Sequence, residues 1–164
     1  MRATRIRSCV TRTLPITILL VLGSLLGACS NVAHPKVRHI GARTVELDQD
    51  RAVIALELEA TNPNEEQLPL TQIKYRVFIG DEQVFAAVRS PELTLDTYTT
   101  RTFEVPCVLD RSRLSGGTIG YTFTGELIYK PPGRFASELY RSRVHVPTVE
   151  FRFDGSLDTS AVSE

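Results

Sequence analysis

Three histidines and one serine are the side chains of this chain that could take part in catalysis. His34, His39 and His145 could bind a metal or transfer a proton. His34 lies in the predicted tether, while His39 and His145 lie on predicted strands with no Cys, Glu or His at ligand spacing. Ser156 follows Gly155, yet the Gly-x-Ser-x-Gly turn that exposes a nucleophilic serine is absent. We therefore expect packed or solvated histidines and a protein that is not an enzyme.

Two acidic pairs are the remaining candidates for metal ligands. Asp48 and Asp50 could share a calcium ion in the turn before Ala52, but no third acid and no glycine follow at the spacing of a calcium loop. Glu65 and Glu66 are best interpreted as a solvated loop, because carboxylates are rarely buried without a partner. The sequence predicts neither a metal nor a cofactor.

Cys29 is the residue whose surroundings predict a covalent modification. Four arginines precede an apolar run over residues 14–26, which is too short for the roughly 20 residues of a membrane span. The following Leu26-Gly27-Ala28-Cys29 resembles the lipobox of bacterial lipoproteins, whose cysteine receives a diacylglycerol before the peptidase cuts. We predict a signal peptide over residues 1–28, cleavage between Ala28 and Cys29, and a lipid on Cys29. An ordinary secretory signal with an incidental cysteine is the alternative.

A lipid on Cys29 would decide where the protein resides. Two or three acyl chains, at about 0.8 kcal/mol per buried methylene, hold a protein permanently on a membrane. By resemblance to Gram-negative sorting rules, Ser30 in place of an aspartate favours the outer membrane over the inner one. The expected location is therefore the periplasmic side of the bacterial outer membrane, and the expected partner is the membrane itself.

The mature chain is acidic and carries one free thiol. Removing four arginines leaves 15 basic against 19 acidic residues, a net charge of −4, which does not attract nucleic acid. Its 136 residues suit one domain, and we expect a monomer. Cys107 has no intrachain partner and shares a strand face with Phe103 and Val105, so we predict a buried structural cysteine.

The chain beyond the anchor has the period-two alternation of β-strands. In the clearest strand, Ile54, Leu56 and Leu58 point one way, away from the glutamates between them. The sequence predicts a lipidated tether over residues 29–36, a β-domain over 37–157 and a disordered tail over 158–164. The expected strands are 37–47, 52–59, 73–79, 84–88, 101–108, 118–129 and 145–153, and the expected short helices are 110–114 and 134–141.

About seven strands without a long helical period predict an all-β fold. We expect an antiparallel two-sheet sandwich similar to immunoglobulin and fibronectin III domains, with one or two short helices. Within it, Asn62-Pro63-Asn64 predicts a turn, because proline fixes φ and asparagine bonds nearby backbone. A ligand contact by this motif is the less favoured interpretation.

The order of several residues resembles the late embryogenesis abundant (LEA) proteins of type 2, whose domain is called WHy, for water stress and hypersensitive response. The likeness covers residues 37–157. It departs in the short helix at 110–114 and in residues 131–143, which look like an insertion. The residues that carry it are Asn62, Pro63, Asn64, Leu68, Pro69, Leu70, Ile73, Tyr75, Gly80, Gly117, Tyr121, Gly125, Leu127, Phe151 and Gly155.

The resemblance implies a non-catalytic protein that protects envelope proteins or membranes under desiccation or other stress. The rival hypothesis is an envelope binding or assembly factor that captures a hydrophobic ligand or a partner protein. A cavity between the sheets, or an apolar patch at Phe78, Phe85 or Ile128, would favour that rival.

Overall fold

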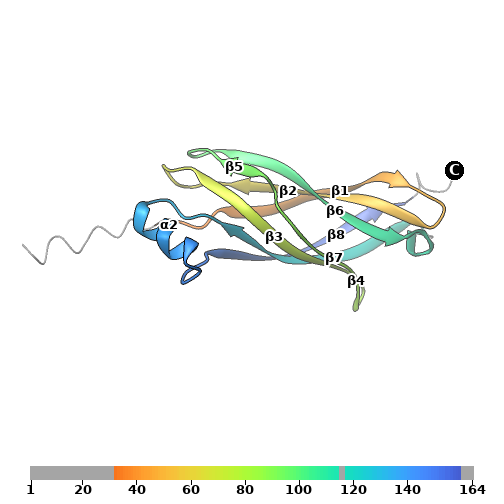
Figure 1. Ribbon diagram of the computed structural model, residues 1–164. Helices are drawn as coiled ribbons and strands as arrows, with labels where there is room; N and C mark the ends of the chain where they lie inside the picture. Colours follow the sequence, from red (N-terminus) through yellow and green to blue (C-terminus); the bar gives the residue numbers. More distant parts are fainter. Residues whose placement is uncertain (1–31, 115–116, 160–164) are drawn as a thin grey trace, which may run out of the picture. The chain divides into compact units, whose positions relative to one another are not determined.

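Two antiparallel sheets make up the part of the chain that can be described. The computed structural model describes residues 32–114 and 117–159, so the predicted signal peptide and lipid site lie outside the described residues. The expected all-β two-sheet sandwich is confirmed (Figure 1), with eight strands in these ranges. The first sheet has the order β1-β2-β6, built from β1 (Lys36–Leu47), β2 (Arg51–Thr61) and β6 (Thr100–Asp110).

The second sheet has the order β4-β3-β7-β8, and a short β5 also pairs with β3. Its strands are β3 (Leu68–Ile79), β4 (Glu82–Arg89), β5 (Leu93–Leu95), β7 (Thr118–Tyr129) and β8 (Thr148–Asp158). The expected hairpin of β3 and β4 is confirmed. A 3-10 helix, η2 (Arg111–Leu114), and one α-helix, α2 (Arg134–Arg141), lie at the two predicted helical segments.

Alternating side chains build the core between the sheets. Along β2, Ile54, Leu56 and Leu58 are buried at 3% exposure or less, while Glu57 and Glu59 stay partly exposed on the other face. The same alternation buries Tyr75 on β3 and Phe123 on β7. Period-two spacing therefore places one face of each strand in the core, as the sequence predicts.

Three expected boundaries were wrong. β3 begins at Leu68 rather than residue 73, and β5, which pairs with it, was not expected. β8 begins at Thr148, because the amides of Val144 and His145 still bond to Leu139 at the end of α2. The expected disordered tail begins too early: Asp158 ends β8, and Thr159 is buried, its amide bonded to a backbone carbonyl 3.0 Å away. Residues 160–164 lie outside the described residues.

Two glycines of the second sheet lie directly opposite aromatic residues. Gly125 pairs with Phe151, and Gly155 pairs with Tyr121, both across the β7–β8 ladder. A Cβ added at Gly125 would lie 2.3 Å from the carbonyl oxygen of Lys74 and 2.6 Å from the ring of Phe151. A Cβ at Gly155 would lie 2.5 Å from the ring of Tyr121. Both rings therefore lie over bare backbone, an arrangement that only glycine permits here.

We predict that Gly125→Ala destabilises the domain by about 2 kcal/mol, because the added methyl group meets rigid backbone as well as a ring. Gly120→Ala on the same strand is the matched control, since nothing lies within 4 Å of its added Cβ. Urea unfolding of both variants measures the difference. Equal stability of the two variants would contradict the close packing described here.

Candidate functional site

The buried side chain of Asn62 holds together the end of the sandwich where the chain passes between the sheets. It is fully buried, and its amide nitrogen donates to three backbone carbonyls: those of Glu66 (2.7 Å), Leu95 (3.3 Å) and Asp96 (3.0 Å). Glu66 lies in the connection from β2 to β3, and Asp96 lies in the connection from β5 to β6. One amide thus joins both connections.

Asn64 extends this arrangement to the N-terminal end of the described chain. The Asn62 Oδ1 atom accepts from the backbone amide (3.0 Å) and the side-chain amide (2.9 Å) of Asn64. Asn64 in turn donates to the carbonyl of Ala33 and accepts from its amide, both at 2.8 Å. The contacts of the Asn62-Pro63-Asn64 motif are thus those of a turn that binds other parts of the backbone.

The segment before β1 packs on the domain rather than hanging free of it. We expected a tether over residues 29–36, but Pro35 is fully buried and Ala33 is bonded to Asn64. His34 accepts or donates a 2.8 Å hydrogen bond at Nδ1 with the hydroxyl of Tyr129. From Ala33 onward the chain is therefore part of the folded unit, and any free tether ends before it.

His39 connects the two sheets. Its Nδ1 lies 3.0 Å from the carbonyl of Glu57, which can only accept, so Nδ1 carries the proton. Nε2 then accepts from the Tyr121 hydroxyl at 2.6 Å, and burial raises the pKa of Tyr121 to about 12. Both ring nitrogens are thus engaged, which matches the expected packed imidazole. His145 is exposed in the loop before β8, not on a strand as expected.

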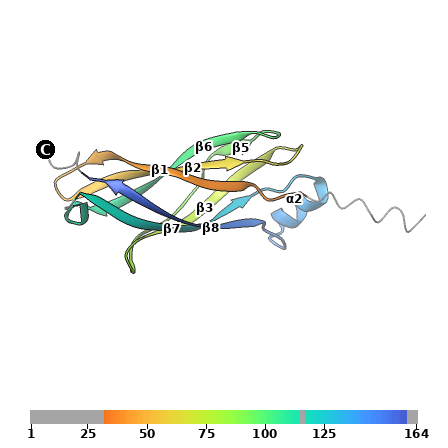
Figure 2. The same ribbon diagram turned by 180° about the vertical axis from the view of Figure 1, so that it is seen from behind.

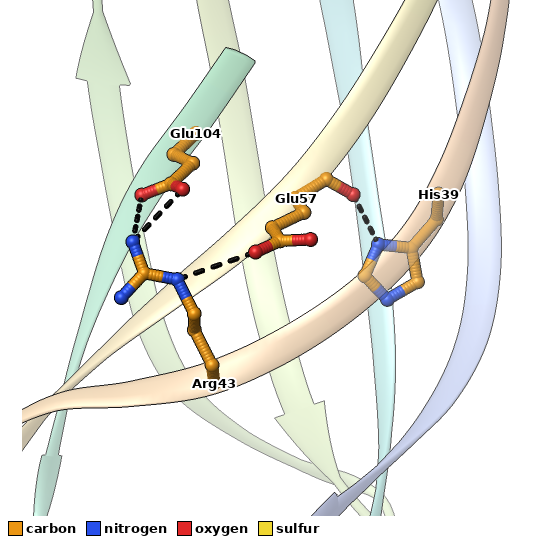
Figure 3. A network of polar contacts seen from close by, with 4 residues as sticks. All are labelled: His39, Arg43, Glu57 and Glu104. Atoms are coloured by element: carbon orange, nitrogen blue, oxygen red, sulfur yellow. Dashed lines mark hydrogen bonds and ion pairs between the residues drawn. The ribbon is translucent and has the colours of Figure 1, made fainter. Parts of the chain in front are cut away.

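Arg43 organises the charged outer face of the first sheet (Figure 3). Its guanidinium binds Glu104 of β6 at 2.8 and 2.9 Å and Glu57 of β2 at 3.2 Å, so three strands are linked. These hydrogen bonds and the charge of Glu104 raise the pKa of Arg43. The groups are solvent-accessible, so the network orders side chains on the sheet surface and offers no desolvated charge for catalysis.

The interior leaves no room for a ligand. The cavity between the sheets measures about 20 Å³ and is lined by apolar side chains, Cys107 and Tyr121 among them. A cavity that binds a molecule as small as benzene measures about 150 Å³, so this space does not hold an organic ligand. Cys107 is buried as predicted, at 1% exposure, and burial raises its pKa to about 12. The thiol is therefore an unreactive part of the core at neutral pH.

An open groove lies on the outer face of the second sheet. It has a volume of about 770 Å³, and its walls come from β3, β4, β7 and β8. Lys74 and Arg76 face it together with Glu126, and Lys74 lies 3.7 Å from Glu126. We call this surface the outer groove; its other charged residues are Glu150 and Arg152. These residues occupy the outward-facing polar positions of the strands. The sequence alone gives no signal that distinguishes them from other solvated residues.

The three residues whose exposure would favour a binding or assembly factor do not form an exposed apolar patch. Ile128 is buried at 7% exposure, and Phe78 and Phe85 are only half-exposed. Within the described residues, no group of three or more His, Cys, Asp or Glu side chains could hold a metal ion. In the same residues, no helix is both long and apolar enough to cross a membrane.

Solved structures with a similar fold include plant proteins. The solution structure of a late embryogenesis abundant (LEA) protein, At2g46140.1, has 14% sequence identity and a TM-score of 0.60, covering 88% of this chain and 85% of that one. AT1g01470 from Arabidopsis thaliana has 12% identity and a TM-score of 0.57, over 80% and 88% of the two chains. A protein from Archaeoglobus fulgidus has 11% identity and a TM-score of 0.51, over 75% and 94%.

The sequence matches no protein-family model and no curated protein. The similarity is therefore one of fold. This similarity to LEA structures agrees with the resemblance seen in the sequence. The chain has a LEA type 2, WHy-like fold.

We predict that Asn62→Asp destabilises the domain by about 2 to 4 kcal/mol at neutral pH. The substitution keeps the shape of the side chain but replaces the amide nitrogen with an oxygen. In the native protein that nitrogen donates to three carbonyl oxygens, so the variant places an oxygen against them. Gln67→Ala is the control, because Gln67 bonds to Asp96 from an exposed position nearby. Urea unfolding measures both variants; an Asn62→Asp variant as stable as the control would show that the amide is dispensable.

We predict that stability falls at alkaline pH because of Cys107. The folded thiol has a pKa of about 12, above the ordinary value near 8.5, so the unfolded chain loses its proton first. Stability is then full below about pH 8.5 and falls by about 2.7 kcal/mol by pH 10.5, at about 1.36 kcal/mol per pH unit. In a Cys107→Ala variant the free energy of unfolding should lose this part of its pH dependence. The part that comes from the buried tyrosines should remain. Equal pH slopes for both proteins, measured by urea unfolding, would contradict burial as the cause.

Proposed function

We propose that this chain is a lipid-anchored, non-catalytic protein of the periplasm, in which a LEA type 2 domain protects envelope proteins or membranes when water activity falls. The observation that carries the proposal is the LEA type 2-like fold with a filled interior. A domain that cannot enclose a ligand acts through its outer surface. Weak contacts with the apolar surfaces of other molecules are the mechanism that suits such a domain, and its net negative charge limits self-association.

The second candidate is an envelope binding or assembly factor that recognises one partner protein. The cavity of about 20 Å³ argues against capture of a hydrophobic ligand between the sheets. The outer groove favours a protein partner, because it offers both signs of charge on a concave surface with alanine and valine of β4 beside them. Mixed charge of this kind fixes the register of a partner more than it adds affinity.

The anchor is tested first, with the native protein and a Cys29→Ser variant. We expect the native protein to have the intact mass of a chain that begins at an acylated Cys29, and to fractionate with the outer membrane. The variant should lose the acyl mass and leave the outer-membrane fraction. It should also keep residues 1–28, because the peptidase cuts only after the cysteine is lipidated. A native mass without lipid would refute the anchor.

Protection is tested by drying or freezing a labile enzyme with the mature protein or with an equal mass of an inert protein. We expect more surviving activity with the mature protein, and an equal effect from a Lys74→Glu, Arg76→Glu variant of the outer groove. No protection beyond the inert protein would remove the stress role. Crosslinking in cells separates the candidates: one specific partner that the groove variant loses would favour the assembly factor over general protection.

A further inference from the structure

Three large apolar side chains of α2 and the loop that follows it are exposed. Phe135 is 78% exposed, Val144 is 74% exposed and Val146 is 38% exposed. Of the other exposed apolar residues, which also include Val88, Tyr98 and Val108, Ile40 and Val45 each fall at a register shift of β1. No such irregularity of a ladder explains the three residues near α2, which belong to the helix and to the loop that follows it.

The two faces of α2 have different roles. Leu139 and Tyr140 are half-buried, and the Tyr140 hydroxyl donates to Thr71 of β3 at 2.9 Å, so this face rests on the sheet. Arg134, Phe135 and Arg141 are exposed. Arg134, Glu138 and Arg141 share the opposite face by helical spacing, and Phe135 lies at the edge of that face. A phenylalanine on the solvent face does not contribute to the core.

The cap of α2 also presents side chains outward. The amide of Arg143 bonds to Tyr140 and the amide of Val144 bonds to Leu139, the pattern of a Schellman cap. Arg143 has φ = 57° at the position where glycine is preferred. Val144, which in such a cap commonly packs back on the helix, is exposed here. Selection for stability alone would place glycine at position 143 and would bury the side chain of residue 144 against the helix.

Basic residues surround these apolar side chains. Arg134, Arg141 and Arg143 are exposed, and Glu138, which pairs with Arg141 at 2.8 Å, is the one acidic residue between positions 130 and 147. We call the exposed set Arg134, Phe135, Arg141, Arg143, Val144 and Val146 the α2 patch. Its charge is opposite to the net −4 of the mature chain. Apolar side chains among arginines are the composition of surfaces that bind anionic lipid headgroups.

The helix α2 lies at the same end of the domain as the start of the described chain (Figure 2). Tyr129 contacts both segments: its hydroxyl bonds to His34, and its amide bonds to the carbonyl of Pro147, at the end of the loop after α2. Cys29 precedes His34 by five residues, which span at most about 18 Å when fully extended. A lipid on Cys29 would therefore hold this end close to the bilayer.

We infer that the α2 patch docks on the anionic phospholipid surface beside the anchor. Phe135, Val144 and Val146 enter the interfacial layer, while the three arginines contact phosphate groups. The inference rests on the proposed lipid anchor for its setting, but the patch would bind anionic lipid without that anchor. Docking at a second point restricts the orientation of the domain on the membrane.

The test uses the mature chain, residues 29–164, with Cys29→Ser, so that no lipid contributes. Residues 32–164 form one compact unit by themselves, so this protein keeps the fold. Vesicles of phosphatidylethanolamine and phosphatidylglycerol, 3:1, are compared with vesicles of phosphatidylcholine alone by co-sedimentation. We expect binding to the anionic vesicles that weakens with added salt, and little binding to the neutral ones.

Three substitutions locate the contact. Phe135→Ala should weaken binding about tenfold, and Arg143→Gly about fivefold. Arg143→Gly should also raise the unfolding temperature slightly, since it removes a side chain from a left-handed backbone position, so its binding loss is not a loss of fold. Val45→Ala is the control, because Val45 is 55% exposed on β1, outside the patch.

Absence of binding to anionic vesicles, or equal binding by all three variants, would overturn the inference. So would a photo-crosslinker at position 135 that reaches a protein in cells and no lipid. The intact mass of the native protein reports separately on Cys29. A native chain without acyl mass would therefore refute the anchor, while vesicle binding that depends on Phe135 and Arg143 would still support the patch.

Discussion

The amide of Asn62 is the constraint on which one end of this sandwich depends, the end where β2 leaves the first sheet. A two-sheet sandwich needs its chain to leave one sheet and enter the other, and both crossings at this end expose backbone carbonyls that the ladders cannot satisfy. Asn62 meets three of those carbonyls from a fully buried position. An unsatisfied buried carbonyl costs about 1 to 3 kcal/mol, so one side chain decides whether both crossings are tolerable.

Inside the sandwich, too, single polar side chains form hydrogen bonds from one sheet to the other. The Tyr75 hydroxyl of β3 donates to the carbonyl of Pro106 on β6, and the Tyr121 hydroxyl of β7 donates to His39 on β1. Pro106 lies on the edge strand of its sheet, where a missing amide costs no ladder bond. Among the described residues, no buried side-chain nitrogen or oxygen lacks a partner. The core is thus fixed by apolar packing and by directional bonds at a few points.

Most of the fold could be predicted from local pattern, and most of the candidate surfaces could not. Alternation identifies β2 because its glutamates and leucines obey a strict period of two, but β5 has only three residues and too little pattern to detect. The docking of Ala33 on Asn64 joins residues 31 positions apart, and no local signal reports it. The Asn62-Pro63-Asn64 turn was predicted from its residue types. Its role in joining the β2–β3 connection, the β5–β6 connection and the N-terminal segment depends on what folds around it.

A filled interior and a bound N-terminal segment together determine how such a domain could act. With about 20 Å³ inside, recognition has to take place on the surface, where the outer groove and the α2 patch differ in composition and in the elements that build them. Because Ala33 and Pro35 are held by the domain, few residues separate Cys29 from folded structure. A lipid on Cys29 would therefore limit the orientation of the domain on the membrane as well as hold it there. The position of the outer groove relative to the bilayer would then depend on the contacts of Asn64, which makes the turn at β2 a determinant of orientation as well as of fold.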